Sequence, residues 1–144
     1  MIEKDTVKLL RECDAGVKMG VSSIEDVLPH VRSGEYEQEL KHCKDEHEAL
    51  SREINSELER FGDDGKEPNA MAKGMSWLKT NVKLGMDESD NTIADLITDG
   101  CNMGVKSLNK YLNKYKAADE VSKDICKRLI KLEEQLAIHS RKYL

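Results

Sequence analysis

The sequence predicts an all-α protein in which residues 1–144 form a single domain, a bundle of four long helices arranged as two antiparallel hairpins. Three observations indicate this class. Apolar residues recur at intervals of three and four along most of the chain, which is the spacing of one helix face. Charged residues make up 35% of the sequence with both signs interspersed, as on solvated helix faces. Strand-length runs of β-branched residues are absent, and glycine and proline are too few for the turns of an all-β fold.

The first predicted helix runs from about Asp5 to Val31. Asp5 is expected to cap its start, and Pro29 to kink the helix or to end it a turn early. Gly16 and Gly20 are four residues apart, so they share a face and allow a neighbouring backbone to approach closely. The inward stripe is expected to contain Leu10, Cys13, Val17, Gly20 or Val21, Ile24, Leu28 and Val31.

The second predicted helix, up to Phe61, has the clearest periodicity in the chain. Ser33, in the short connection 32–34, is a suitable N-cap, and Gly62 can adopt the left-handed conformation that ends a helix. So short a connection forces the two helices to lie antiparallel. His47 occupies a position in the stripe where an apolar residue would cost less. The stripe contains Tyr36, Leu40, Cys43, His47, Leu50, Ile54, Leu58 and Phe61.

Residues 63–68 form the one clear break in the periodicity, and a shorter amphipathic helix is predicted at about 69–84. A connection of roughly 25 residues is long for a structureless loop. It suits a helical segment that crosses the length of a four-helix bundle. This segment contains Trp77 and has more apolar surface than a crossover needs. A homodimer through this region, or through the glycine-bearing helix faces, is therefore expected.

The second predicted hairpin consists of a helix from Ser89 or Asp90 to Tyr115, a tight link at 116–119 and a helix at about 120–143. The inward residues of its first helix are expected to be Ile93, Ile97, Cys101, Gly104, Leu108, Leu112 and Tyr115. Those of its second helix are expected to be Val121, Ile125, Leu129, Leu132, Leu136, His139 and Tyr143.

An internal repeat relates the two hairpins. The segment GVKMGVSSIEDVL, from Gly16, matches GCNMGVKSLNKYL, from Gly100, and the match places Gly20 on Gly104. A duplicated hairpin would pack with its copy about a pseudo-twofold axis. The alternative is that any two amphipathic helices with small interface residues look alike, and the second helices of the hairpins align poorly.

With this arrangement the chain resembles the ferritin-like superfamily, and within it the bacterial ferritin-like four-helix-bundle domains of unknown function. The CDAG stretch at 13–16 is similar to one in the first helix of those domains. Di-iron members of the superfamily carry a glutamate on each of two helices and Glu-x-x-His on each of the other two. Laid on this chain, the motif histidines fall on His47 and His139, but the motif glutamates fall on Lys44 and Leu136. The resemblance therefore implies a ferritin-like bundle with a degenerate di-iron site.

A smaller metal site can also be built around His47. With a rise of ~1.5 Å per residue and the hairpin links as level marks, Cys101 and Glu133 are expected at about the height of His47, near the middle of the bundle. Glu46 is next to His47 in the sequence. An imidazole, a thiol and two carboxylates could hold one zinc or, less comfortably, one iron ion. The other interpretation of His47 is a core histidine hydrogen-bonded to a carboxylate or a carbonyl.

Two functions remain open on the sequence, and whether the protein is an enzyme is not decided. The first is a binding or structural module that has lost the di-iron ligands and works through association or a bound small molecule. The second is a metal-binding (iron or zinc) oxidoreductase or metal-storage protein with an irregular site around His47. The two interpretations make opposite predictions about bound metal.

Composition narrows the expected partners and location. The formal net charge of −5, without a basic block, argues against nucleic acid and anionic membrane as main partners. No apolar run approaches the ~20 residues of a membrane-spanning helix, and the N-terminal stretch does not have the pattern of a signal peptide. A cytoplasmic protein is therefore expected. The four cysteines are scattered singly without a C-x-x-C pair, so they are expected to be buried, reduced thiols.

Overall fold

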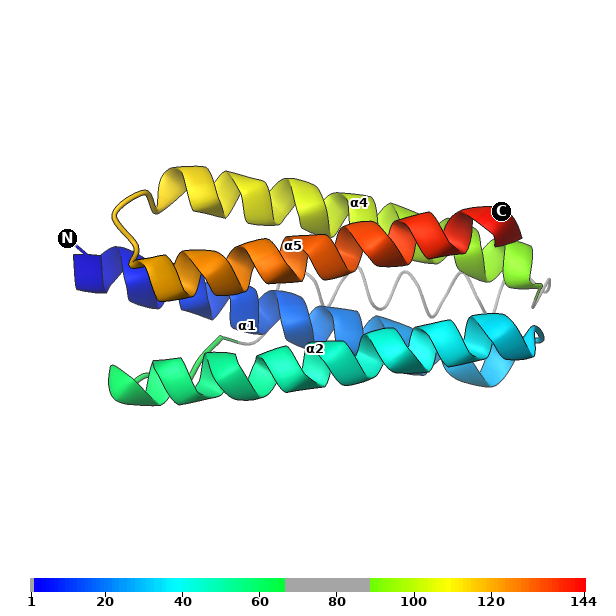
Figure 1. Ribbon diagram of the computed structural model, residues 1–144, viewed down its shortest axis with the longest axis horizontal. Helices are drawn as coiled ribbons and strands as arrows, with labels where there is room; N and C mark the ends of the chain where they lie inside the picture. Colours follow the sequence, from blue (N-terminus) through cyan, green and yellow to red (C-terminus); the bar gives the residue numbers. More distant parts are fainter. Residues whose placement is uncertain (1, 67–88) are drawn as a thin grey trace.

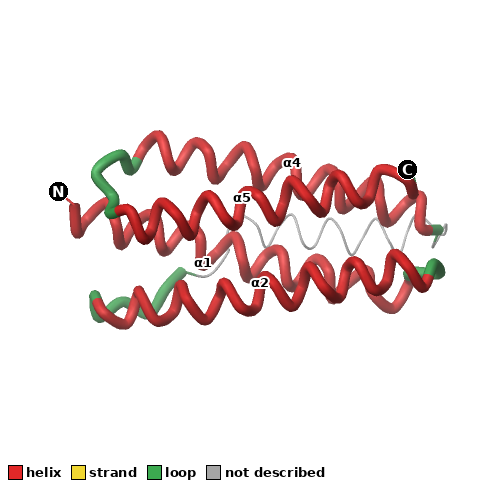
Figure 2. Tube along the Cα trace, in the orientation of Figure 1, coloured by secondary structure: helices red, strands yellow, loops and turns green. Residues whose placement is uncertain are grey.

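The computed structural model describes residues 2–66 and 89–144, and it shows four long helices packed side by side (Figure 1). All regular structure in these two ranges is helical, which confirms the all-α prediction (Figure 2). The predicted short helix at 69–84, with Trp77, lies outside the described residues. The long helices are α1 (Ile2–Val27), α2 (Gly34–Arg60), α4 (Asp90–Lys114) and α5 (Glu120–Ser140).

The helices form two antiparallel hairpins, as predicted. α1 pairs with α2, and α4 pairs with α5. Between the hairpins, α2 packs on α5, and α1 packs on both α4 and α5. The C-terminus of α2 and the N-terminus of α4 lie at opposite ends of the bundle, and α4 runs along the edge opposite α2 (Figure 1). Each hairpin therefore buries its inner face against the other.

The ends of α1 differ from the sequence prediction. The helix begins at Ile2, and Asp5 does not cap it; the Asp5 carboxylate instead accepts a hydrogen bond from the backbone N–H of Ala117 in the link between α4 and α5 (3.0 Å). The helix ends at Val27, because Pro29 has no N–H to continue it. A 3-10 turn, Leu28–His30, follows. The early stop at Pro29 is one of the two outcomes that the sequence allowed.

The predicted starts of α2, α4 and α5 and the predicted end of α2 are confirmed, whereas α5 ends at Ser140, before the predicted Tyr143, and a 3-10 turn, Arg141–Tyr143, follows it. Ser33 caps α2 by accepting a hydrogen bond from the N–H of Tyr36, and Ser89 caps α4 in the same way. Asp119 caps α5 through a 2.8 Å hydrogen bond from the N–H of Ser122. Gly62 follows α2 with φ of +66°, a conformation that glycine adopts without steric cost.

Equivalent contacts join the hairpins at the two ends of the bundle. The N–H of the cap residue Ser33 donates to the Asp90 carboxylate (2.9 Å), and the N–H of the cap residue Asp119 donates to the Thr6 hydroxyl (2.8 Å). Thr6 and Asp90 are as far apart in the sequence as the repeat glycines at 16 and 100. The Ser33–Asp90 and Asp119–Thr6 contacts are therefore equivalent, as expected if a pseudo-twofold axis relates the two hairpins.

The interior consists of two apolar clusters, one in each half of the bundle. One contains Ile24, Leu40, Cys43, Ile97, Cys101 and Leu136 among others, and the second contains Leu10, Cys13, Val17, Leu50, Cys126 and Leu129 among others. All the expected stripe positions of α2 up to Leu58 are buried. Since both clusters draw residues from all four helices, the core holds the two hairpins together as one body.

The inward face of α5 lies partly outside the predicted stripe. Ile125, Leu129 and Leu136 are buried as expected, but Val121 is 48% exposed and His139 is also exposed. α5 packs against α4 on one side and against α1 and α2 on the other, so it buries a wider stripe than a two-helix contact would. That stripe also includes Ser122, Cys126, Ile130, Glu133, Ala137 and Ser140.

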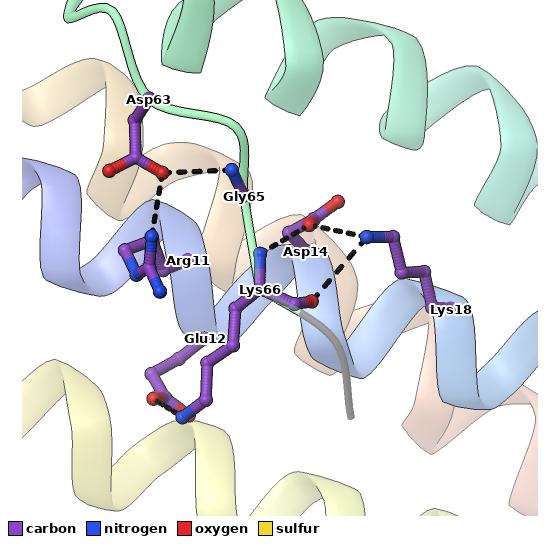
Figure 3. Close-up of polar contacts among 7 residues, drawn as sticks. All are labelled: Arg11, Glu12, Asp14, Lys18, Asp63, Gly65 and Lys66. Carbon is purple, nitrogen blue, oxygen red and sulfur yellow. Dashed lines mark hydrogen bonds and ion pairs between the residues drawn. The ribbon is translucent and has the colours of Figure 1, made fainter. Parts of the chain in front are cut away.

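The segment that follows α2 is held against α1 by polar contacts (Figure 3). Asp14 is only 1% exposed, and its Oδ2 accepts hydrogen bonds from the N–H of Lys66 and the ammonium of Lys18, both at 2.9 Å. Gly65 has φ of +90°, and a Cβ there would lie 2.3 Å from Asp14 Oδ2. Only glycine fits this turn without displacing the buried carboxylate. The segment 63–66 is therefore fixed to the middle of α1.

Candidate functional site

His47 of α2 lies at the centre of the bundle with no exposed surface. Its Nδ1 is 2.8 Å from the backbone carbonyl oxygen of Cys43, one helical turn earlier, and 3.5 Å from the Cys43 sulfur. Because a carbonyl can only accept, Nδ1 carries the proton and donates it. This hydrogen bond fixes the orientation of the ring and directs Nε2 away from α2, towards the second hairpin.

Glu133 of α5 is the hydrogen-bond partner of His47 Nε2. His47 Nε2 lies 2.9 Å from Glu133 Oε1, and only 8% of Glu133 is exposed. The two residues belong to different hairpins, so their hydrogen bond crosses the interface between them. An isolated charge at either position would be costly to bury, but each one satisfies the other.

Two glycines make room for the pair. A Cβ at Gly20 of α1 would lie 2.8 Å from two atoms of the His47 ring, a distance that real contacts essentially never show. A Cβ at Gly104 of α4 would lie 3.6 Å from Glu133 Oε2, an ordinary contact. These are the two glycines that the sequence repeat superimposes. The first helix of each hairpin thus places its repeat glycine against the polar residue on the second helix.

The pair occupies a special position in the repeat. His47 and Glu133 are 86 positions apart, which is also the separation of the two cap residues Ser33 and Asp119. His47 and Glu133 therefore occupy equivalent positions in the two hairpins, and these equivalent residues contact each other. This places the pair on the approximate twofold axis, between the two apolar clusters.

The surroundings of His47 favour its charged form. Burial by itself would lower the pKa of His47, but hydrogen bonds with Cys43 and Glu133 and the negative charge of Glu133 outweigh burial and raise the pKa from 6.5 to about 10. The ring is then an imidazolium at neutral pH, and both of its nitrogens donate hydrogen bonds. The core of the bundle accordingly holds an ion pair.

Cys101 of α4 is the third member of the polar layer. Its burial, the charge of Glu133 and a hydrogen bond with Glu133 all raise the pKa of the Cys101 thiol. All four cysteines are free and buried, as the sequence predicted. A hydrogen bond with Cys126, together with burial, likewise raises the pKa of Cys13. Thiols that remain protonated are poor nucleophiles and poor metal ligands.

The structure brings three of the four predicted site residues together. His47 and Glu133 are in direct contact, and Cys101 contacts Glu133. Glu46 is exposed, and its carboxylate lies 3.0 Å from Nε2 of His42 on the outer face of α2. Within the described parts of the chain, no three His, Cys, Asp or Glu side chains are arranged to hold a metal ion.

Sequence reasoning missed two residues of this site. Cys43 was placed only in the apolar stripe, although its position four residues before His47 puts it on the same helix face. Gly20 was recognised as an interface residue, but its partner was not. The contact between Gly20 and the His47 ring could have been predicted only if the relative heights of α1 and α2 in the bundle had been known.

Comparisons of the chain with protein-family models, with curated proteins and with solved structures find no significant match. In the described residues, no helix is both long enough and apolar enough to cross a membrane.

Proposed function

We propose that this protein is a binding or structural module: a ferritin-like helical bundle in which an ion pair occupies the place of a degenerate di-iron site. The observation that carries the proposal is the saturation of His47. One ring nitrogen donates to the Cys43 carbonyl and the other to Glu133. Neither nitrogen has a lone pair free for a metal while these bonds hold.

The remaining positions of a di-iron site support the same conclusion. Two hard cations need several convergent carboxylates. Around His47 the described ranges 2–66 and 89–144 offer one carboxylate, from Glu133, together with glycines from α1 and α4 and thiols from α2 and α4. A bundle of this kind has no reactive centre to protect and works through its outer surfaces.

The alternative is a single zinc or iron ion held by His47, Cys101 and Glu133. One feature favours it: metal-ligating histidines commonly donate their second ring N–H to a carbonyl or carboxylate, as His47 does to Cys43. For such a site the ring must lose its Nε2 proton, the thiol must ionise, and Glu133 must move aside. Each of these steps opposes the interactions that stabilise the protonated groups.

Metal analysis decides between the two proposals. The protein is expressed with iron, manganese and zinc present, purified without a metal-affinity tag and analysed by inductively coupled plasma mass spectrometry. We expect far less than one metal ion per chain. His42→Ala, which removes an exposed histidine from the same helix, is the control for His47→Ala. Near-stoichiometric metal that is lost in His47→Ala and kept in His42→Ala would overturn the proposal in favour of the metal site.

A further inference from the structure

The outer face of α4 separates its charges by sign. Asp95 and Asp99 lie in its N-terminal half, and Lys106 and Lys110 lie in its C-terminal half, all on one exposed stripe. Met103 lies between them and is 58% exposed. A Cβ at the neighbouring Gly100 would meet nothing within 4 Å.

Along the exposed stripe of α4 the acids precede the bases, whereas acids and bases alternate along α2 and α5. Several exposed charges of α2 and α5 pair with opposite charges four residues away, as in Glu37–Lys41 and Asp124–Arg128, although Lys127 and Lys131 of α5 also carry like charges. On α4 the residues four apart, Asp95 with Asp99 and Lys106 with Lys110, have like charges, and each such pair destabilises the helix by about 0.2–0.5 kcal/mol. None of the four charged residues of the stripe forms an ion pair with another residue in the described ranges. The stripe therefore carries an unfavourable pattern that no contact within the described chain relieves.

We propose that the outer face of α4 is a homodimer interface in which two copies of α4 pack antiparallel. The pairs 95 with 110 and 99 with 106 share one midpoint, between positions 102 and 103. A twofold axis there would place Asp95 opposite Lys110 of the second copy, and Asp99 opposite its Lys106. Each dimer then contains four intermolecular pairs of opposite charge, with both copies of Met103 at the centre.

A second copy of the chain explains the stripe better than a polyanion does. A nucleic acid or an acidic surface would match the lysines of the C-terminal half but would be repelled by Asp95 and Asp99. The self-complementary order of acids and bases matches only an antiparallel copy of itself. Exposed ion pairs are weak and are screened by salt. The dimer should therefore be salt-sensitive.

Charge reversal tests this interface in the full chain. Sedimentation velocity at low salt should show a concentration-dependent dimer for the native protein. Asp95→Lys/Asp99→Lys gives an all-basic stripe and Lys106→Glu/Lys110→Glu an all-acidic one. Each should raise the dissociation constant more than about tenfold, because like charges then oppose each other. An equimolar mixture of the two variants should dimerise again, as should the chain that carries all four reversals.

A matched control separates the stripe from overall charge. Lys127→Glu/Lys131→Glu, at exposed positions of α5, makes the same change in net charge as Lys106→Glu/Lys110→Glu and should leave dimerisation unchanged. A native protein that stays monomeric at ~100 µM and low salt, the concentration scale of weak complexes, would overturn the proposal. So would a dimer that survives either reversal, or a mixture of the two variants that fails to associate.

This inference rests on the proposed role as a binding or structural module, but different results would overturn the α4 interface and the proposed function. A monomer without metal would overturn the α4 interface and leave the ion-pair interpretation of His47 intact. Stoichiometric metal lost in His47→Ala would overturn the proposed function, whatever the α4 variants do.

Discussion

Replacing Glu133 by methionine removes the negative partner of His47 while keeping a side chain of similar length. The ring of His47 is fully buried, so water cannot replace the lost carboxylate. Since each tenfold change in proton affinity corresponds to about 1.4 kcal/mol, a pKa of about 10 in the folded state, against 6.5 unfolded, corresponds to roughly 4 kcal/mol at pH 7. Measured losses on breaking buried ion pairs are about 3–5 kcal/mol. We therefore expect Glu133→Met to lower the free energy of unfolding by about 3–4 kcal/mol.

Urea unfolding followed by circular dichroism at pH 7 measures this loss. Glu134→Met, at an exposed position on the same helix, is the control and should change stability by less than about 0.5 kcal/mol. His47→Leu should be strongly destabilising for the complementary reason, because it leaves Glu133 buried without its partner. The double variant His47→Leu/Glu133→Met should recover most of the loss, since buried pairs can often be replaced by apolar residues of similar volume.

A double-mutant cycle of His47→Leu and Glu133→Met tests whether the two residues form a pair. A coupling energy near 3 kcal/mol between the two sites is expected, because each single change strands a buried polar group. A cost of less than about 1 kcal/mol for Glu133→Met, or single effects that add up to that of the double variant, would show that the pair is not formed in the protein. His47 would then have to find another partner.

Four further results are expected. The stability that His47 contributes is fully present below pH 6.5 and is lost as the pH rises towards about 10, so urea midpoints of the native protein should fall across this window relative to those of the double variant. Gly20→Ala should lower stability by about 1–3 kcal/mol because its Cβ overlaps the ring, whereas Gly104→Ala, with room for a Cβ, should raise it by about 0.5–1 kcal/mol in thermal melts. The four buried thiols should react with dithiobis(nitrobenzoate) only on unfolding, and fast reaction of any of them in the native protein would contradict their burial. Asp14→Ala should increase amide hydrogen exchange at Lys66, whose N–H loses its acceptor, with little effect on the helices.

The sequence predicts the helices and their pairing because these features depend on local periodicity and on short links. The stripe of α2 needs only intervals of three and four residues, and the cap Ser33 needs only its position before a helix. Corrections appear where a residue contacts something distant. Asp5, expected to cap α1, instead binds the link of the other hairpin. The outer edge of α5 was misplaced because its neighbours on three helices set the width of its buried face.

The candidate site follows the same rule. Counting residues from the links placed His47, Cys101 and Glu133 at one height, and these three do meet. Counting cannot fix the rotation of a helix, so Glu133 and Glu46 looked equivalent in the sequence. In the structure one is buried in the core and the other is exposed to solvent. The difference arises from the second hairpin, which rotates Glu133 inward to meet the charge of His47.

The repeat explains why the charged pair sits at the centre of the bundle. Equivalent residues of two related hairpins meet on the axis between them, so two copies of the first hairpin would bring His47 against His47. Two copies of the second would bring Glu133 against Glu133. Both arrangements bury like charges without compensation, and a slip of one helical turn, ~5.4 Å, would separate the pair in the native arrangement. One histidine and one glutamate at the axis therefore favour the pairing of unlike hairpins in a single register, as a single buried polar residue does in coiled coils. A pair that fixes how the two halves of a chain combine has a structural reason to be buried.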